Sequence, residues 1–213
     1  MAKISESTVS RLSHYYRVLE EVAAEGGKVI SSQLLAEREG ITSAQVRKDL
    51  SYFGSFGRRG LGYSVEHLRE QIRAILGLDR RWRVAIVGAG HIGSALLAYR
   101  GFSSQGFDVV AVFDADAQQV GRTTGALQVR HIAQLSAADE IDIGVIATPV
   151  RAAQEVAEAL VAAGVRGILN FAPRKLRVPD DVWVRTVDMT TEFEGLSFAL
   201  TQPDGPRRRR AAG

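Results

Sequence analysis

The sequence contains no cysteine and no long hydrophobic run. Without cysteine the chain can form no disulfide, activate no thiol and hold no cysteine-ligated zinc. Any redox behaviour must therefore come from a bound cofactor. No apolar stretch approaches the roughly 20 residues that cross a bilayer, and residues 1–10 lack the apolar core of a signal peptide. These absences predict a cytoplasmic protein with no membrane partner.

The net charge of +3 is unevenly distributed along the chain. Residues 1–78 carry +2, residues 79–206 carry −3, and Arg207–Arg210 add +4. Overall basicity is therefore weak evidence for nucleic-acid binding, because it arises mainly from the C-terminal tail. A local cluster is better evidence, since four cations stand against the single anion Asp49 between positions 47 and 59.

Apolar residues recur at helical spacing in four places within residues 1–78. Each predicted helix opens at a Ser or Thr that can cap it. The helices are expected over residues 5–24, 31–40, 42–53 and 64–76. The second and third are joined at Gly40, which predicts a helix-turn-helix whose third helix enters the major groove of DNA.

The third helix has a polar outer face that suits contacts with DNA. Arg and Lys donate to guanine, Gln pairs with adenine, and Ser or Tyr can bind phosphates. The candidate DNA-binding residues here are Ser43, Gln45, Arg47, Lys48, Ser51 and Tyr52. A solvated, charged helix face is the alternative interpretation and is commoner for an isolated pattern.

A glycine-rich stretch at residues 54–63 follows the third helix. Its four glycines surround Arg58 and Arg59, which is the composition of a tight β-hairpin with a cationic tip. Arginines on such a hairpin can enter a minor groove, although an ordinary exposed hairpin is the alternative. The helices and hairpin together predict a winged-helix DNA-binding domain at residues 1–78.

The second half of the chain opens with an apolar strand at residues 83–87 and a G-x-G-x-x-G motif. The motif is formed by Gly88, Ala89, Gly90, His91, Ile92 and Gly93, and a helix follows it. In dinucleotide-binding folds the first glycine makes the turn, the second lets the backbone approach the pyrophosphate, and the third packs helix on strand. These six residues are predicted cofactor contacts.

A second apolar strand at residues 109–114 ends in Asp114, where an acid binds the ribose hydroxyls and repels a 2′-phosphate. NAD(H) is therefore expected rather than NADP(H), and Asp116 either assists or caps a turn. Strands at residues 141–147 and 167–170 and a helix at residues 150–163 continue the pattern. It predicts an α/β, Rossmann-type parallel sheet over residues 81–187. Strand ends border the ligand crevice of such sheets, and ordinary turns are the alternative there. The residues concerned are Thr148, Pro149, Asn170, Phe171, Ala172 and Pro173.

Residues 45–54, read as Gln-Val-Arg-Lys-Asp-Leu-Ser-Tyr-Phe-Gly, carry a family resemblance together with Gly57, Gly60 and Gly62-Tyr63. This pattern resembles the signature of Rex, a family of bacterial redox-sensing repressors, and the similarity extends over about residues 5–200. The resemblance implies a homodimer that represses from palindromic double-stranded operator DNA and is released by NADH. The direction of that response comes from the resemblance alone.

Residues 188–202 are predicted to form a helix with Phe193, Leu196 and Leu200 on one face. Packing on its own domain is one possibility, whereas the resemblance implies that it is exchanged between subunits of a homodimer. Residues 203–213 are expected to be a disordered basic tail.

A polar latch between the two predicted domains is a further hypothesis from the sequence. Arg17, Tyr99 and Asp188 lie at predicted domain junctions and match polar residues of the Rex family. NADH would rearrange this latch; a simple surface hydrogen bond is the alternative for each residue.

An NAD-dependent dehydrogenase is the main alternative function, because Rossmann domains often belong to such enzymes. The sequence offers no well-placed acid or base: His14, His67 and His131 lack an evident partner, and His91 lies within the glycine motif. No segment remains for a substrate domain. We therefore expect no catalytic residue and no metal site, with NADH and NAD+ as sensed ligands. A regulator that senses another nucleotide, such as a CoA derivative, is the second alternative.

Overall fold

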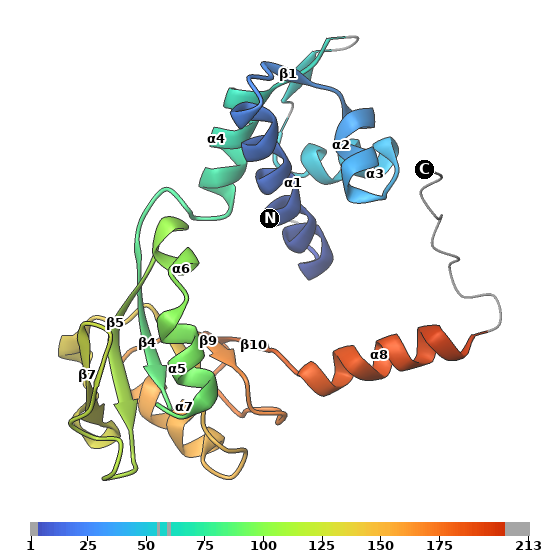
Figure 1. Cartoon of the computed structure of the whole chain (residues 1–213). Helices are drawn as coiled ribbons and strands as arrows, with labels where there is room; N and C mark the ends of the chain where they lie inside the picture. The colour runs from blue at the N-terminus through green and yellow to red at the C-terminus, as the bar shows by residue number, and fades with distance from the viewer. Residues whose placement is uncertain (1–3, 55, 59–60, 203–213) are drawn as a thin grey trace. The chain divides into compact units, whose positions relative to one another are not determined.

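The chain divides into two compact units, Met1–Arg80 and Arg81–Gly213. The structure is a computed structural model that describes residues 4–54, 56–58 and 61–202 (Figure 1). Each unit has its own hydrophobic core. Within the described residues, no helix is long and apolar enough to cross a membrane. The predicted basic tail, residues 203–213, lies outside the described residues.

The described part of the first unit contains the four predicted helices. They are α1 (Glu6–Ala24), α2 (Ser32–Glu39), α3 (Ser43–Ser51) and α4 (Val65–Ile75). A hydroxyl side chain caps each one by accepting a backbone N–H, and the caps are Ser5, Ser31, Thr42 and Ser64. Gly40 ends α2 in the left-handed conformation, with φ of 65°. The helix-turn-helix prediction is confirmed.

A small antiparallel sheet in the order β1-β3-β2 completes the winged helix. Its strands are β1 (Val29–Ile30), β2 (Gly57–Arg58) and β3 (Gly62–Ser64). Gly62 has φ of +80°, and a Cβ there would lie 2.6 Å from the carbonyl oxygen of Ile30, so the hairpin requires glycine at this position. Arg59 lies outside the described residues, and only the backbone of Arg58 is described.

The second unit is built on a seven-stranded sheet in the order β10-β9-β8-β4-β5-β7-β6. The strands are β4 (Trp82–Val87), β5 (Phe107–Asp114), β6 (Thr123–Thr124), β7 (Leu127–His131), β8 (Ile143–Ile146), β9 (Gly167–Asn170) and β10 (Trp183–Thr186). All neighbours pair in parallel except β6, which runs antiparallel to β7. The chain leaves β4 toward β5 and β7, then returns to β8 on the other side of β4. This is the Rossmann strand order, and its switch point lies between β4 and β8.

Helices pack on the two faces of the sheet (Figure 1). Successive side chains of β4 point to opposite faces, so apolar residues of this strand need cover on both sides. The helices are α5 (His91–Ala98), α6 (Gly101–Ser104) and α7 (Ala153–Ala162), with short 3₁₀ turns at Ile132–Gln134 and Ala137–Asp139. The last helix, α8 (Met189–Thr201), follows β10, extends away from the sheet and has no buried residue (Figure 1). Val87 belongs to the core formed with α7, whereas Ile86 packs with Leu96 of α5. The sheet is therefore buried by different helices on its two faces.

Several element boundaries differ from the sequence predictions. The helix after the glycine motif begins at His91, within the motif, because Gly90 is its N-cap. The helix expected from residue 150 begins at Ala153, since residues 149–152 form a turn in which the Ala152 amide donates to the Pro149 carbonyl. The short strands β7 and β10 were not predicted from the sequence, because charged residues interrupt their apolar patterns.

Candidate functional site

The glycine motif connects β4 to α5 at the switch point of the sheet. Gly88 has φ of +107°, and a Cβ there would lie 2.6 Å from the carbonyl oxygen of Ala147, just beyond β8. A Cβ on Gly93 would lie 1.8 Å from the carbonyl oxygen of Gly88. Neither position has room for a side chain, so α5 can approach the strand only because both residues are glycine.

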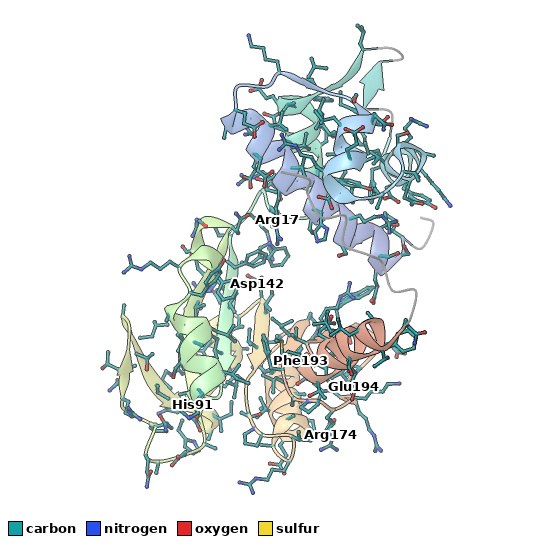
Figure 2. The ribbon with its side chains drawn as sticks, turned by 45° about the vertical axis from the view of Figure 1, so that its right-hand side comes forward. Arg17, His91, Asp142, Arg174, Phe193 and Glu194 are labelled. Carbon is teal, nitrogen blue, oxygen red and sulfur yellow. The ribbon has the colours of Figure 1, made fainter. Side chains whose placement is uncertain are left out.

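Gly90 differs from the other two glycines of the motif, Gly88 and Gly93, because a Cβ added to it would meet no atom within 4 Å. It is the N-cap of α5 and provides no side-chain cap. The first amides of a helix lack partners within the helix and attract anions. His91 and Ile92 at this end are exposed, and Figure 2 shows His91 at the end of the helix. The start of α5 therefore fits a pyrophosphate group.

Asp114 lies at the end of β5, beside the glycine motif. One carboxylate oxygen accepts the amide of Ala89 at 2.7 Å, and the other accepts the amide of Asp116 at 2.9 Å. A carboxylate has about four lone-pair sites, so acceptor capacity remains for ribose hydroxyls. Asp116 accepts the amide of Gln118 at 2.9 Å and therefore caps a turn. Asp114 both fixes the glycine motif and fits the ribose role.

Thr148 and Pro149 follow β8, on the opposite side of the switch point. The Oγ1 atom of Thr148 is buried and, among the described residues, has no hydrogen-bond partner. Buried polar atoms are nearly always paired, so this hydroxyl fits a polar group of a bound ligand. Pro149 is exposed. Together with Gly90 and Asp114, these residues fit a dinucleotide.

The predicted crevice residues at the end of β9, residues 170–173, differ in how far they are buried. Asn170 is completely buried. Its side-chain amide donates to the carbonyl oxygens of Ala172 and Arg174 and accepts the backbone amide of Ala172. Its side chain is therefore engaged within the protein, and a cofactor contact of Asn170 stays a prediction. Phe171 is half-buried, Ala172 is buried and Pro173 is exposed.

The recognition helix α3 presents much of the predicted polar face. Arg47, Lys48, Ser51 and Tyr52 are exposed, and Ser43 is half-buried. The Arg47 guanidinium donates to Ser32 Oγ at 3.0 Å, which orients it across the turn between α2 and α3. The Ser51 hydroxyl donates to the Lys48 carbonyl at 2.7 Å. This face can offer two cations to DNA.

Asp49 is the single anion that the sequence shows among the four cations between positions 47 and 59. It is completely buried and therefore adds no negative charge to the basic surface. Arg11 donates to both of its oxygens, at 2.6 and 2.8 Å, and the Tyr15 hydroxyl donates at 2.8 Å. Gln45 also donates to Asp49 at 2.8 Å and is half-buried, so its amide is not oriented for a base. The cationic face of α3 thus carries no exposed carboxylate from Asp49.

The ionisation of this network follows from its geometry. Burial alone opposes the charged form of Asp49, but hydrogen bonds from Arg11, Tyr15 and Gln45 outweigh it and lower the pKa of the carboxyl group. Burial and the bond to Asp49 raise the pKa of Tyr15. Helical spacing carried a signal for this network, because position 49 lies on the same face of α3 as Val46 and Leu50.

The structure describes all three residues of the hypothetical latch, one in the first unit and two in the second. Arg17 is exposed on α1 (Figure 2), in the first unit. In the second unit, Tyr99 is exposed with its ring edge-on to Phe102 at 4.9 Å between centroids. Asp188 caps α8 by accepting the Thr190 amide at 3.0 Å. Within the described residues, no cluster of His, Asp and Glu could hold a metal ion.

Two family models match the chain. Residues 3–51 match a family described as putative DNA-binding protein N-terminus, and residues 79–174 match one described as CoA binding domain. The two matches fall in the two structural units.

Full-length relatives give the family. The redox-sensing transcriptional repressor Rex of Carboxydothermus hydrogenoformans is 50% identical over 201 residues, covering 93% of this chain and 97% of that protein. Rex of Syntrophomonas wolfei is 47% identical and covers 93% and 96%. These relatives are named repressors, so the family is not one of dehydrogenases.

Solved structures agree with these relatives. RSP in complex with β-NAD+ and operator DNA has a TM-score of 0.90 at 37% identity, with 94% of each chain covered. RSP in complex with β-NADH has a TM-score of 0.84 at 35% identity, covering 94% of this chain and 95% of the other. A further structure of the same protein is described as RSP, a Rex-family repressor. The chain therefore belongs to the Rex family of redox-sensing transcriptional repressors.

Proposed function

We propose that this protein represses transcription by binding operator DNA and releases the DNA when NADH binds. The observation that carries the proposal is the pairing, in one chain, of a cationic recognition helix with a glycine-lined dinucleotide edge. The relatives support it, because RSP binds β-NAD+, β-NADH and operator DNA. A repressor acts where its operator is, so we place the protein in the cytoplasm.

NADH and NAD+ are the proposed ligands of the crevice between β4 and β8. The amides at the start of α5 would hold the pyrophosphate, and Asp114 would hold a ribose. The two forms of the dinucleotide differ by one positive charge and by the planarity of the nicotinamide ring. Thr148 and residues 171–173 would border that ring. A ligand changes DNA affinity only if it binds the two states of the protein differently.

Operator DNA is the proposed partner of α3 and the hairpin. Arg47 and Lys48 would enter the major groove, Ser43, Ser51 and Tyr52 would contact phosphates, and Arg58 and Arg59 would approach the minor groove. Gln45 is bonded to Asp49 and serves to hold the helix instead. A palindromic operator would match two such helices related by a two-fold axis.

A homodimer is proposed on the basis of apolar surface in the second unit. Apolar side chains of α8 are exposed, including Phe193 at 65% and Leu200 at 86% (Figure 2). A cavity of about 380 Å³ lies over the sheet and is lined almost entirely by apolar groups, among them Ile86, Val145 and Trp183. Surfaces of this kind mark protein interfaces. The α8 helix of a second copy is the proposed partner.

The function is tested by fluorescence anisotropy on a labelled palindromic operator selected from random DNA. We expect NADH to release the DNA at concentrations where NAD+ does not, with CoA as a further comparison. A swing of about 3 kcal/mol corresponds to a change of about 150-fold in affinity. Equal indifference to NADH and NAD+ would refute the redox role, and release by CoA alone would favour the CoA alternative.

Replacement of two cations on α3 should weaken DNA binding of every sequence. For the double variant Arg47→Ala/Lys48→Ala we expect the salt dependence of operator binding to flatten by about two units of slope, because each cation in the groove neutralises DNA phosphate charge and each neutralised charge contributes about 0.9. Titrations at several salt concentrations measure this. Lys175→Ala/Arg177→Ala removes two exposed cations of the second unit and should leave the slope unchanged; an equal loss in both would argue against the assigned face.

Asp188→Ala tests the latch. We expect operator affinity without NADH to stay within about twofold of the wild type, while the release by NADH is lost. The comparison variant is Glu192→Ala, an exposed carboxylate one turn along α8. Anisotropy with and without NADH measures both. A normal response in Asp188→Ala would remove this residue from the latch.

A further inference from the structure

Asn170 ends β9 at the carboxyl edge of the sheet, and its side chain is completely buried. Nδ2 donates to the carbonyl oxygens of Ala172 and Arg174, each at 2.9 Å, and lies 3.4 Å from Oγ1 of Thr186. Oδ1 accepts the amide of Ala172 at 2.9 Å. A primary amide has two N–H donors, so both are used within the protein. Asn170 therefore acts on neighbouring segments of the chain.

The first of these segments is the loop 171–174, which continues β9 into the proposed cofactor crevice. Its Phe171 amide donates to the carbonyl oxygen of Ile146, the last residue of β8, at 2.9 Å. Ala172 packs into the core, whereas Pro173 and Arg174 are exposed, and Arg174 is labelled in Figure 2. A loop at this edge borders the crevice in which such sheets bind their ligands.

The second segment is the junction between β10 and α8. Thr186 lies opposite Asn170 in the parallel register, and the Val187 amide donates to the Asn170 carbonyl at 2.8 Å. The next residue, Asp188, is the N-cap of α8. The N-cap of α8 therefore directly follows Val187, whose backbone amide is bonded to Asn170.

We propose that Asn170 is a positioning residue that couples the crevice loop to the start of α8. A buried amide that loses a partner leaves an unsatisfied polar group, so the loop and the α8 junction should shift together. This inference rests on the proposed function and adds the route by which the crevice reaches the dimer helix. It also explains why a fully buried side chain stands at a strand end that borders the crevice.

The test uses the full-length protein with Asn170→Asp, which keeps the side-chain shape but replaces the Nδ2 donor by an oxygen. That oxygen would face the carbonyl groups of Ala172 and Arg174. The Kd for NADH is measured from the fluorescence of bound NADH. The second quantity is the ratio of operator affinities without and with saturating NADH. We expect operator affinity without NADH within about twofold of wild type, but a ratio reduced at least about tenfold.

Two further variants make the result decisive. Lys175→Ala, an exposed side chain next to the loop, should change neither quantity. Thr186→Val removes only the Oγ1 atom that lies 3.4 Å from Nδ2 of Asn170. Because Thr186 is exposed on β10, this variant keeps the proposal testable if Asn170→Asp fails to fold. For Thr186→Val we expect the ratio to fall about twofold to threefold, with an unchanged Kd for NADH.

The outcomes separate the coupling role from a merely structural one. A folded Asn170→Asp protein with the wild-type ratio overturns the proposal. So does a defect that disappears at higher NADH concentration, because that shows only weaker binding. If Asn170→Asp does not fold, an unchanged ratio in Thr186→Val overturns it. A wild-type protein that ignores NADH refutes the proposed function itself, and this is seen before any variant is compared.

Discussion

Gly93→Ala is expected to abolish the response to NADH while operator binding persists. A Cβ at this position would lie 1.8 Å from the carbonyl oxygen of Gly88, so α5 must move away from β4 and the glycine motif must change shape. Overpacking of this kind costs up to about 3 kcal/mol, and such a cost on the NADH-binding conformation lowers NADH affinity by up to about 150-fold. The fluorescence of bound NADH measures the affinity, and anisotropy measures operator binding.

Gly90→Ala is the matched control for this prediction, because its Cβ would meet no protein atom. We expect that variant to keep the wild-type melting temperature and yet to lose NADH affinity, since the methyl group occupies space that the pyrophosphate needs. Gly93→Ala should lower both the melting temperature and the affinity for NADH. Normal NADH binding in both variants would contradict the assignment of this edge as the dinucleotide site.

Asp49→Ala should unfold much of the first unit and abolish operator binding while NADH binding remains. The substitution leaves the Arg11 guanidinium without the carboxylate that it contacts through two hydrogen bonds. Removing one partner of a buried ion pair costs about 3–5 kcal/mol, a large share of the stability of a small domain. Both tryptophans, Trp82 and Trp183, lie in the second unit. Denaturant titrations can therefore follow that unit by tryptophan fluorescence and the whole chain by circular dichroism.

The effect of Asp49→Ala should depend on pH in a defined direction. The pKa of Asp49 in the folded protein lies below its ordinary value of 3.8, so the stabilisation is present above that value and is lost as pH falls through the folded pKa. The stability difference between wild type and variant should therefore shrink in acid. Arg38→Ala, which removes exposed ion pairs with Glu21 and Glu25, should cost far less stability, because solvent screens such pairs. Equal losses in the two variants would argue against the Asp49 network.

Features that depend on a few consecutive residues were predictable from the sequence. The glycine motif is one, because the tight turn and the close packing of α5 depend on positions 88, 90 and 93 alone. The four helices of the first unit are another, since each begins at a hydroxyl residue that accepts a backbone N–H. The helix-turn-helix followed from these caps and from Gly40.

Features that depend on contacts between distant segments were predicted less well. The buried network of Asp49 was not predicted because its partner Arg11 is 38 residues away, although helical spacing places Asp49 beside Val46 and Leu50. Asn170 was assigned to the ligand because strand ends border the crevice, and its bonds within the protein were not predicted. The short strands β7 and β10 form because a neighbouring strand offers hydrogen bonds, which a local pattern does not reveal.

The most direct test of the central claim is the affinity for NADH measured with and without saturating operator DNA. If NADH releases the DNA by binding the two states of the protein differently, linkage requires the operator to weaken NADH binding by the same factor. We predict that the two factors, each on the order of 100-fold, agree. An NADH affinity that is unchanged by the operator would contradict the account.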